Sequence, residues 1–204
     1  MSASHDAFFA RPSRGAVLRT AAIALLVGGA FAFGYRYVVA TGVEELEAPR
    51  PAPAFTHRDA SEWINSPPLD LRALRGRVVL LDVWTFDCWN CYRSIPWLKG
   101  VESRYASRGL QVIGVHSPEF DHERDRSAVE GKVKEFGIGH PVMLDNDFSY
   151  WDALNNRFWP AYYLIDRRGD IRAYYVGETH AGQARARALE AKLEELLGEP
   201  APGR

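Results

Sequence analysis

The sequence predicts an α/β sandwich with a central mixed sheet, preceded by one N-terminal transmembrane helix. Residues 77–115 follow a strand–helix–strand pattern, which indicates two parallel strands joined by a right-handed crossover. Residues 161–197 read as a hairpin and an amphipathic helix, which adds antiparallel strands to the sheet. An uncharged apolar run near the N-terminus stands apart from both patterns and predicts the transmembrane helix.

Composition and charge exclude several classes of protein. Of the 204 residues, 47% are hydrophobic and 12% aromatic, which excludes a disordered or collagen-like chain. The 25 Lys+Arg and 26 Asp+Glu residues leave a formal net charge of -1 at pH 7. This balance gives no positive field for a phosphate backbone, so we expect no nucleic-acid partner. The 2 cysteines are too few for a disulfide-stapled scaffold.

Residues 17–40 are predicted to be a transmembrane signal anchor. Their uncharged run, Thr20–Tyr35, lies between Arg19 and Arg36, whose long side chains can reach the two membrane interfaces. Arginines cluster before this run and glutamates follow it. The positive-inside rule then places residues 1–16 in the cytoplasm and the folded domain on the periplasmic or extracytoplasmic face of the cytoplasmic membrane. A cleaved secretory signal and a buried core helix are the two alternatives.

Residues 41–54 are predicted to be a proline-rich linker. This segment is acidic at first and then alternates with proline, as EELEAPRPAPA over residues 44–54. Such a composition is typical of a semi-rigid extended spacer, which would hold a domain off the membrane surface. We therefore expect the folded domain to occupy residues 55–204.

Hydrophobic periodicity and glycines predict the elements of the folded domain. Apolar positions repeat at helical spacing over Cys88–Arg108, and Gly109 ends that helix in the left-handed conformation. A polar loop, His116–Asp125, follows the second strand. Gly169 supplies the positive φ of a hairpin turn between the last two strands. The predicted strands cover 77–84, 110–115, 141–144, 161–165 and 170–176, and the other helices 126–136, 149–156 and 183–197.

The motif Cys88-Trp89-Asn90-Cys91 lies where the first strand turns into its helix. A helix N-terminus stabilises a thiolate, so we expect a lowered pKa for Cys88 and the role of attacking nucleophile. Cys91 lies one turn further on, where it can resolve a mixed disulfide. The alternatives are weaker, because a static disulfide in so short a loop restricts the unfolded chain little, and a four-ligand zinc site lacks its second cysteine pair. We expect no metal and no cofactor.

The segment around these cysteines resembles the thioredoxin active site. In Asp82–Cys91, DVWTFDCWNC, an aspartate stands on the buried strand, a tryptophan follows two residues later, and the C-x-x-C begins four residues after that. Pro96, Trp159-Pro160, Gly169 and Gly177 stand where thioredoxins carry a helix-kinking proline, a cis-proline and two turn glycines. An insertion containing HSPEF, LDNDFSYWDALNN and FWPAYYLID resembles TlpA-like redoxins, and among them the C-terminal domain of DipZ-type membrane proteins.

This resemblance covers about residues 68–197 and implies a thioredoxin-like three-layer sandwich. It implies that Cys88 is the nucleophile, that Cys91 is the resolving thiol and that Asp82 takes the proton of Cys91 through water. The alternative for Asp82 is a satisfied buried carboxylate. The resemblance also implies that protein substrates contact the residues between the cysteines and the cis-proline pair, which are Trp89, Asn90, Trp159 and Pro160. Otherwise Pro160 is a strand-edge proline.

The expected function is that of a membrane-tethered extracytoplasmic thiol–disulfide oxidoreductase. It would exchange electrons with protein disulfides and dithiols, as a reductant supplied by a transmembrane electron donor. The resemblance favours this direction. Asp87 favours it too, because a carboxylate next to Cys88 opposes the helix dipole, which acts in the other direction, and destabilises the thiolate. The alternative is direct oxidation of secreted chains.

Two other functions were weighed against this one. A thioredoxin-fold peroxidase would use Cys88 with the Thr85 hydroxyl, although the proline of that signature is replaced by Leu81. A non-enzymatic carrier would bind Cu(I) with both cysteines and His116, which we otherwise expect in a polar loop. Glu119, Asp121 and His122 read as a solvated loop that needs no metal.

Overall fold

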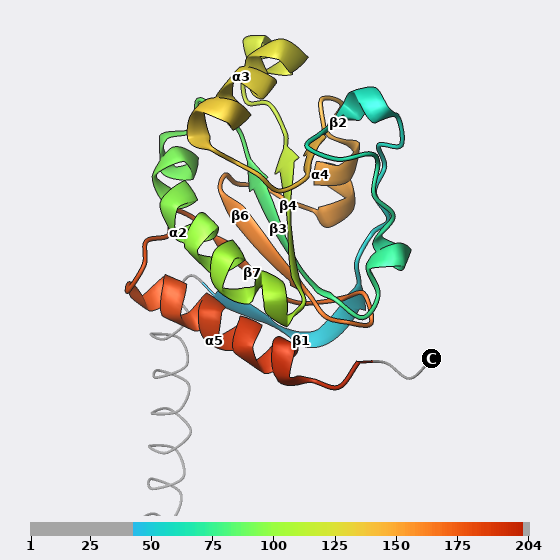
Figure 1. The fold of residues 1–204 in the computed structure, drawn as a ribbon, viewed down its shortest axis with the longest axis vertical. Helices are drawn as coiled ribbons and strands as arrows, with labels where there is room; N and C mark the ends of the chain where they lie inside the picture. The colour runs from blue at the N-terminus through green and yellow to red at the C-terminus, as the bar shows by residue number, and fades with distance from the viewer. Residues whose placement is uncertain (1–42, 202–204) are drawn as a thin grey trace, which may run out of the picture. The chain divides into compact units, whose positions relative to one another are not determined.

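The computed structural model describes residues 43–201, which belong to one compact unit built on a seven-stranded mixed sheet (Figure 1). The strand order is β1-β7-β6-β3-β4-β5-β2. The pairs β3–β4 and β4–β5 are parallel and the other four pairs are antiparallel. The strands are β1 (Val43–Pro51), β2 (Trp63–Ile64), β3 (Val78–Trp84), β4 (Leu110–His116), β5 (Val142–Leu144), β6 (Ala161–Ile165) and β7 (Asp170–Val176). This arrangement confirms the predicted α/β class with a mixed sheet.

The central strand β3 is buried on both faces, as its run of β-branched and apolar residues predicts. Alternate side chains enter two different cores. Val78 and Leu80 pack with α2 (Trp89–Tyr105) and α5 (Ala184–Gly198). Val79 and Leu81 pack on the opposite face with side chains of α4 (Ser149–Leu154). Helices therefore cover both faces of the sheet and make three layers (Figure 1).

Local signals end the helices where the sequence predicts. Helix α2 contains Pro96 and runs into a 3-10 turn that Gly109 closes at a φ of 99°. Helix α3 (Arg126–Phe136) begins at Asp125, whose side chain accepts a hydrogen bond from a backbone N–H of the first turn, and Gly137 closes it at a φ of 64°. The hairpin β6–β7 turns at Gly169, at a φ of 91°. All three turn glycines adopt the left-handed backbone that this residue type tolerates.

The N-terminal edge of the sheet differs from the expectation. The predicted linker over residues 41–54 is extended, but Val43–Pro51 is hydrogen-bonded to β7 as the antiparallel edge strand β1. Prolines are tolerated at an edge because their missing N–H leaves no gap in a ladder. The register shifts between Glu45 and Arg50. The folded unit therefore begins before the predicted boundary at Phe55.

The predictions for residues 1–16 and 17–40 lie outside the described residues. Within 43–201, the helices are too short or too polar to cross a membrane.

Candidate active site

Cys88 and Cys91 form a disulfide at the start of α2, with their Cα atoms 5.2 Å apart. Cys88 is the N-cap residue of the helix, and its Sγ accepts a hydrogen bond from the Cys91 N–H at 3.2 Å. Cys88 is half-buried, whereas Cys91 is buried. The exposure of the two sulfurs therefore matches an attacking first cysteine and a sheltered second one.

Asp82 lies on β3 and is buried. Burial raises the pKa of its carboxyl to about 7, against a small opposing effect of His140. Within residues 43–201 the carboxylate accepts no hydrogen bond that would stabilise its charge. A buried acid with this pKa can exchange a proton near neutral pH. The catalytic role of Asp82 stays a prediction.

The Trp159–Pro160 peptide bond is cis and leads directly into β6. The Trp159 ring packs on Trp151 at 4.3 Å between centroids, and its Nε1–H donates to the Ser117 carbonyl at 3.0 Å. Trp159 and Cys88 pack against the same buried cluster, which contains Trp84 and Ile95. The fold therefore brings the cis-proline loop and the disulfide together from segments that lie far apart in the sequence.

Exposed aromatic side chains gather in the segments that surround the disulfide. Among the described residues, the large hydrophobic side chains that stay exposed are Trp89 at 66%, Phe158 at 58%, Phe120 at 50% and Tyr92 at 46%. Two stand in the first turn of α2, one directly before the cis pair, and one in the loop after β4. Trp89 was predicted from the sequence; the other three were missed, although an aromatic residue beside a redox motif is a readable signal.

Behind the loop that leads into Cys88 lies a buried polar chain that the sequence analysis missed. The Thr85 hydroxyl donates to the Glu123 carboxylate, and His116 Nε2 lies 3.4 Å from the Thr85 oxygen. His116 is the last residue of β4 and is fully buried, so the expectation of a polar loop histidine is corrected. Burial lowers the pKa of His116 to about 4, against the opposing charge of Glu123, and keeps the ring neutral at physiological pH.

Glu119, Asp121 and His122 are predicted to form a solvated loop. His122 is exposed as expected, but its Nε2 lies 2.6 Å from an oxygen of Asp87. The carboxylate expected to oppose the helix dipole therefore has a partner of its own. Thr85 is buried and its hydroxyl is committed to Glu123, so it is not free to orient a peroxide at Cys88.

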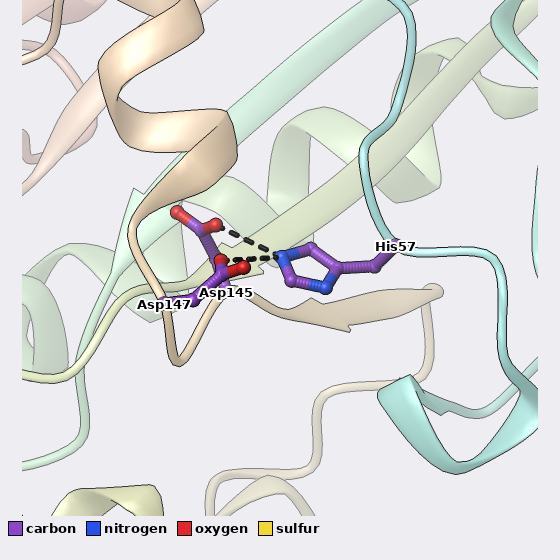
Figure 2. Close-up of side chains that lie close together, drawn as sticks. All are labelled: His57, Asp145 and Asp147. Atoms are coloured by element: carbon purple, nitrogen blue, oxygen red, sulfur yellow. Dashed lines mark hydrogen bonds and ion pairs between the residues drawn. The ribbon is translucent and has the colours of Figure 1, made fainter.

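One cluster of potential metal ligands occurs within residues 43–201, and it contains neither cysteine. It consists of His57, Asp145 and Asp147 (Figure 2). His57 Nε2 lies 3.0 Å from Asp145 and 3.3 Å from Asp147, while Nδ1 lies 2.9 Å from Glu62. The Asp145 carboxylate also accepts the backbone N–H groups of Tyr150 and Trp151 and the Ser117 hydroxyl.

Carboxylates lie at both ring nitrogens of His57, and they favour the protonated ring, in which both nitrogens donate. Burial lowers the pKa of His57, but the hydrogen bonds to Glu62 and Asp145 outweigh burial and raise it overall. The cluster thus ties the segment before β2 to the turn before α4, without a need for an ion.

A disulfide at a helix N-terminus, beside a cis-proline loop on a mixed sheet, is the arrangement of a thioredoxin-like domain. The chain belongs to the redoxin family, whose model matches residues 48–193.

Three relatives illustrate the range of this similarity. Protein DipZ of Mycobacterium bovis is 38% identical over 165 residues, which cover 79% of this chain and 23% of DipZ. The thiol-disulfide oxidoreductase YkuV of Bacillus subtilis is 26% identical over 150 residues, which cover 74% of this chain and 96% of YkuV. The crystal structure of a thiol-disulfide isomerase from Corynebacterium glutamicum superposes with a TM-score of 0.61 and 28% identity, covering 73% of this chain and 98% of that one. The chain thus spans about a quarter of the length of DipZ but almost all of the shorter relatives.

Proposed function

We propose that this protein is a membrane-tethered extracytoplasmic reductant of protein disulfides. The observation that carries the proposal is the Cys88–Cys91 disulfide beside the Trp159–Pro160 loop, within a border of exposed aromatic side chains. The names of YkuV and of the Corynebacterium isomerase support disulfide chemistry for a chain of this fold.

The reaction begins with the reduced pair. The Cys88 thiolate attacks one sulfur of a substrate disulfide, which forms a mixed disulfide and releases the other substrate sulfur as a thiolate. Cys91 then gives its proton to Asp82 through water and attacks the Cys88 sulfur, which releases the second substrate thiolate. Two electrons pass to the substrate, the pair ends as the disulfide, and the two substrate thiolates take up protons.

The border of the site favours a polypeptide substrate over a small thiol. Trp89, Tyr92, Phe120 and Phe158 offer apolar contact area that a small disulfide cannot cover. The backbone next to the cis-proline pair can add a short extended segment of substrate beside the disulfide. Trp89, Asn90, Trp159 and Pro160 are the residues that we expect the substrate to contact.

Electrostatics favour a reductant. Two carboxylates, Asp87 and Glu123, lie on or next to the loop that precedes Cys88. Among the described residues, Asp87 has the imidazole of His122 as a partner, whereas Glu123 has hydrogen bonds but no ion-pair partner. Negative charge near Cys88 destabilises its thiolate, which favours the oxidised pair and therefore electron donation.

The tether rests on sequence: the uncharged run Thr20–Tyr35, the arginines before it, and the resemblance to DipZ-type membrane proteins. A membrane position suits a reductant that receives electrons from a transmembrane donor.

Trapping tests the reaction. In the full chain, Cys91→Ala leaves Cys88 unable to release its substrate, so mixed disulfides with envelope proteins should accumulate and dissolve on reduction. Cys88→Ala is the matched control and should trap nothing. Equal trapping by both variants, or none by either, would contradict the proposed function.

An impermeant maleimide should label the reduced pair in intact cells. Labelling only after lysis would contradict the extracytoplasmic position.

A further inference from the structure

Glu123 is a fully buried carboxylate that the exchange reaction does not use directly. It lies in the 3-10 turn Asp121–Arg124, and its two oxygens bind two different loops. Oε1 accepts the Thr85 hydroxyl and, at 3.0 Å, the Asp87 N–H. Oε2 accepts the Glu119 N–H at 2.7 Å and the Phe120 N–H at 2.8 Å. One side chain therefore clamps the loop into Cys88 against the loop after β4.

The four donors keep Glu123 ionised in the protein interior. Burial raises its pKa, but the hydrogen bonds from Thr85 and the three backbone N–H groups outweigh burial and lower it overall. No lysine or arginine nitrogen within residues 43–201 lies at ion-pair distance from this carboxylate. The neighbouring His116 is neutral because it is buried. Glu123 is thus an uncompensated buried negative charge.

This charge contacts the residue that precedes the reacting cysteine. Glu123 binds the N–H of Asp87, the residue directly before Cys88. In a low-dielectric interior, a buried negative charge opposes ionisation of a nearby thiol more strongly than an exposed negative charge does. The other titratable groups around the site are Asp87 with its partner His122, neutral His116, and Asp82 on β3. The first turns of α2 add Tyr92 and Arg93, and Arg93 pairs with Glu178 at 3.0 Å.

We propose that Glu123 is a positioning residue that makes the Cys88–Cys91 pair reducing. Its hydrogen bonds to the 85–87 loop fix its negative charge at that loop, and the charge destabilises the Cys88 thiolate. A helix N-terminus alone would stabilise the Cys88 thiolate and hence the reduced form. The negative charge of Glu123 offsets this stabilisation of the Cys88 thiolate at the N-terminal end of α2. The inference deepens the proposed function and rests on it.

The test compares Glu123→Gln with the full parent chain. The variant keeps the shape of the side chain and removes its charge. Equilibration in glutathione buffers, followed by counting of alkylatable cysteines, gives the equilibrium constant for disulfide formation. We expect this constant to fall about tenfold at pH 9, which corresponds to a potential about 30 mV less negative, and to change little at pH 6. The difference between variant and parent should grow with pH, because the Glu123 charge affects only the ionised form of Cys88.

The matched control is Glu130→Gln, since Glu130 is exposed on α3 and pairs with Arg126. This variant should keep the parent potential at every pH. The pH profile of Cys88 alkylation gives a second readout, in which Glu123→Gln should lower the apparent thiol pKa by about one unit. A merely structural role would shift the potential equally at pH 6 and pH 9, and that result would overturn the proposal, as would no shift at all.

A measurement on the parent protein covers the case in which Glu123→Gln fails to fold. Coupling between two charges is reciprocal, so ionisation of Cys88 should move the side-chain carboxyl 13C resonance of Glu123 in the reduced protein. A resonance that ignores the titration of Cys88 would overturn the proposal. The midpoint potential of the parent protein tests the proposed direction of electron flow separately. The Glu123→Gln comparison depends only on the difference in potential between variant and parent.

Discussion

At the scale of single residues, burial decides which groups can move protons near neutral pH. Asp82 on β3 has its pKa raised to about 7, whereas burial of His116 lowers its pKa to about 4. Asp82 is therefore close to half-ionised under physiological conditions, and His116 is always neutral. Of the two, only Asp82 can serve as the base for Cys91.

Replacing Asp82 by Asn should slow the resolution of the mixed disulfide about 100-fold at pH 7, since general base catalysis contributes about this much. The mixed disulfide at Cys88 should accumulate, and acid quenching with mass spectrometry would detect it. In the parent, the resolution rate should rise with pH through an inflection near 7, which the variant lacks. Asp152→Asn, an exposed change on α4, is the control. Resolution at the parental rate and pH profile in Asp82→Asn would rule out the base.

At the scale of elements, two attachments hold the N-terminal part of the folded unit on the sheet. The His57 side chain joins the segment before β2 to Asp145 and Asp147 (Figure 2). Strand β1 pairs along β7 and covers its edge. Both attachments bridge segments that are distant in the chain.

The His57 attachment should depend on pH. Its pKa is raised in the folded state, so its contribution is fully present below the ordinary value of 6.5 and is lost as pH rises through the higher folded value. His57→Asn should lower the free energy of unfolding by about 2 kcal/mol at pH 6, and by less at pH 9. Denaturant unfolding at both pH values measures this difference. The same deficit at pH 6 and pH 9 would argue against an imidazolium, and exposed His122→Asn serves as the control.

Truncation tests the edge strand. A fragment of residues 55–204 lacks β1, whereas a fragment of residues 43–204 retains it. Loss of the ladder should cost about 2 kcal/mol or more and leave the β7 edge open to self-association. Thermal unfolding and sedimentation of the two fragments would show whether this is so. Equal melting temperatures and monomeric behaviour of both would mean that β1 contributes nothing.

The elements that the sequence predicts well carry their signals locally. Helix α3 falls at its predicted bounds because Asp125 caps it and Gly137 ends it, and the β6–β7 hairpin because Gly169 forms its turn. The sequence predicts a linker where strand β1 forms, because the partner of this strand in the described sheet, β7, lies more than a hundred residues later. Strand β2 has two residues and no periodicity.

The residues of the site also fall into those with local sequence signals and those that depend on distant contacts. Cys88 and Cys91 follow from the C-x-x-C spacing, and Asp82 follows from the resemblance of residues 82–91 to the thioredoxin active site. Glu123 reaches back 36 residues to Asp87, and His57 reaches forward 88 residues to Asp145. Contacts across such separations exist only once the sheet has assembled.

At the scale of the whole molecule, the fold concentrates its exposed aromatic side chains where the redox chemistry is. Trp89→Ala should raise KM for a protein disulfide about tenfold, because a central aromatic contact is worth about 1 to 2 kcal/mol in an interface. The rate with a small aromatic disulfide should stay within twofold. Steady-state kinetics with both substrates measures the split, and Phe158→Ala should behave similarly. An equal loss of activity with both substrates would mean that Trp89 affects the reactivity of the disulfide and not the docking of the protein substrate.

The most direct test of the account is the midpoint potential of the full chain. The protein is equilibrated in defined thiol–disulfide buffers at pH 7, and free cysteines are alkylated and counted at each potential. The account predicts a reversible two-electron transition of Cys88 and Cys91 near the roughly −270 mV of thioredoxin. A midpoint near the roughly −120 mV of strong oxidants would reverse the direction of electron flow. Two thiols that never form a reversible disulfide with each other would contradict the account altogether.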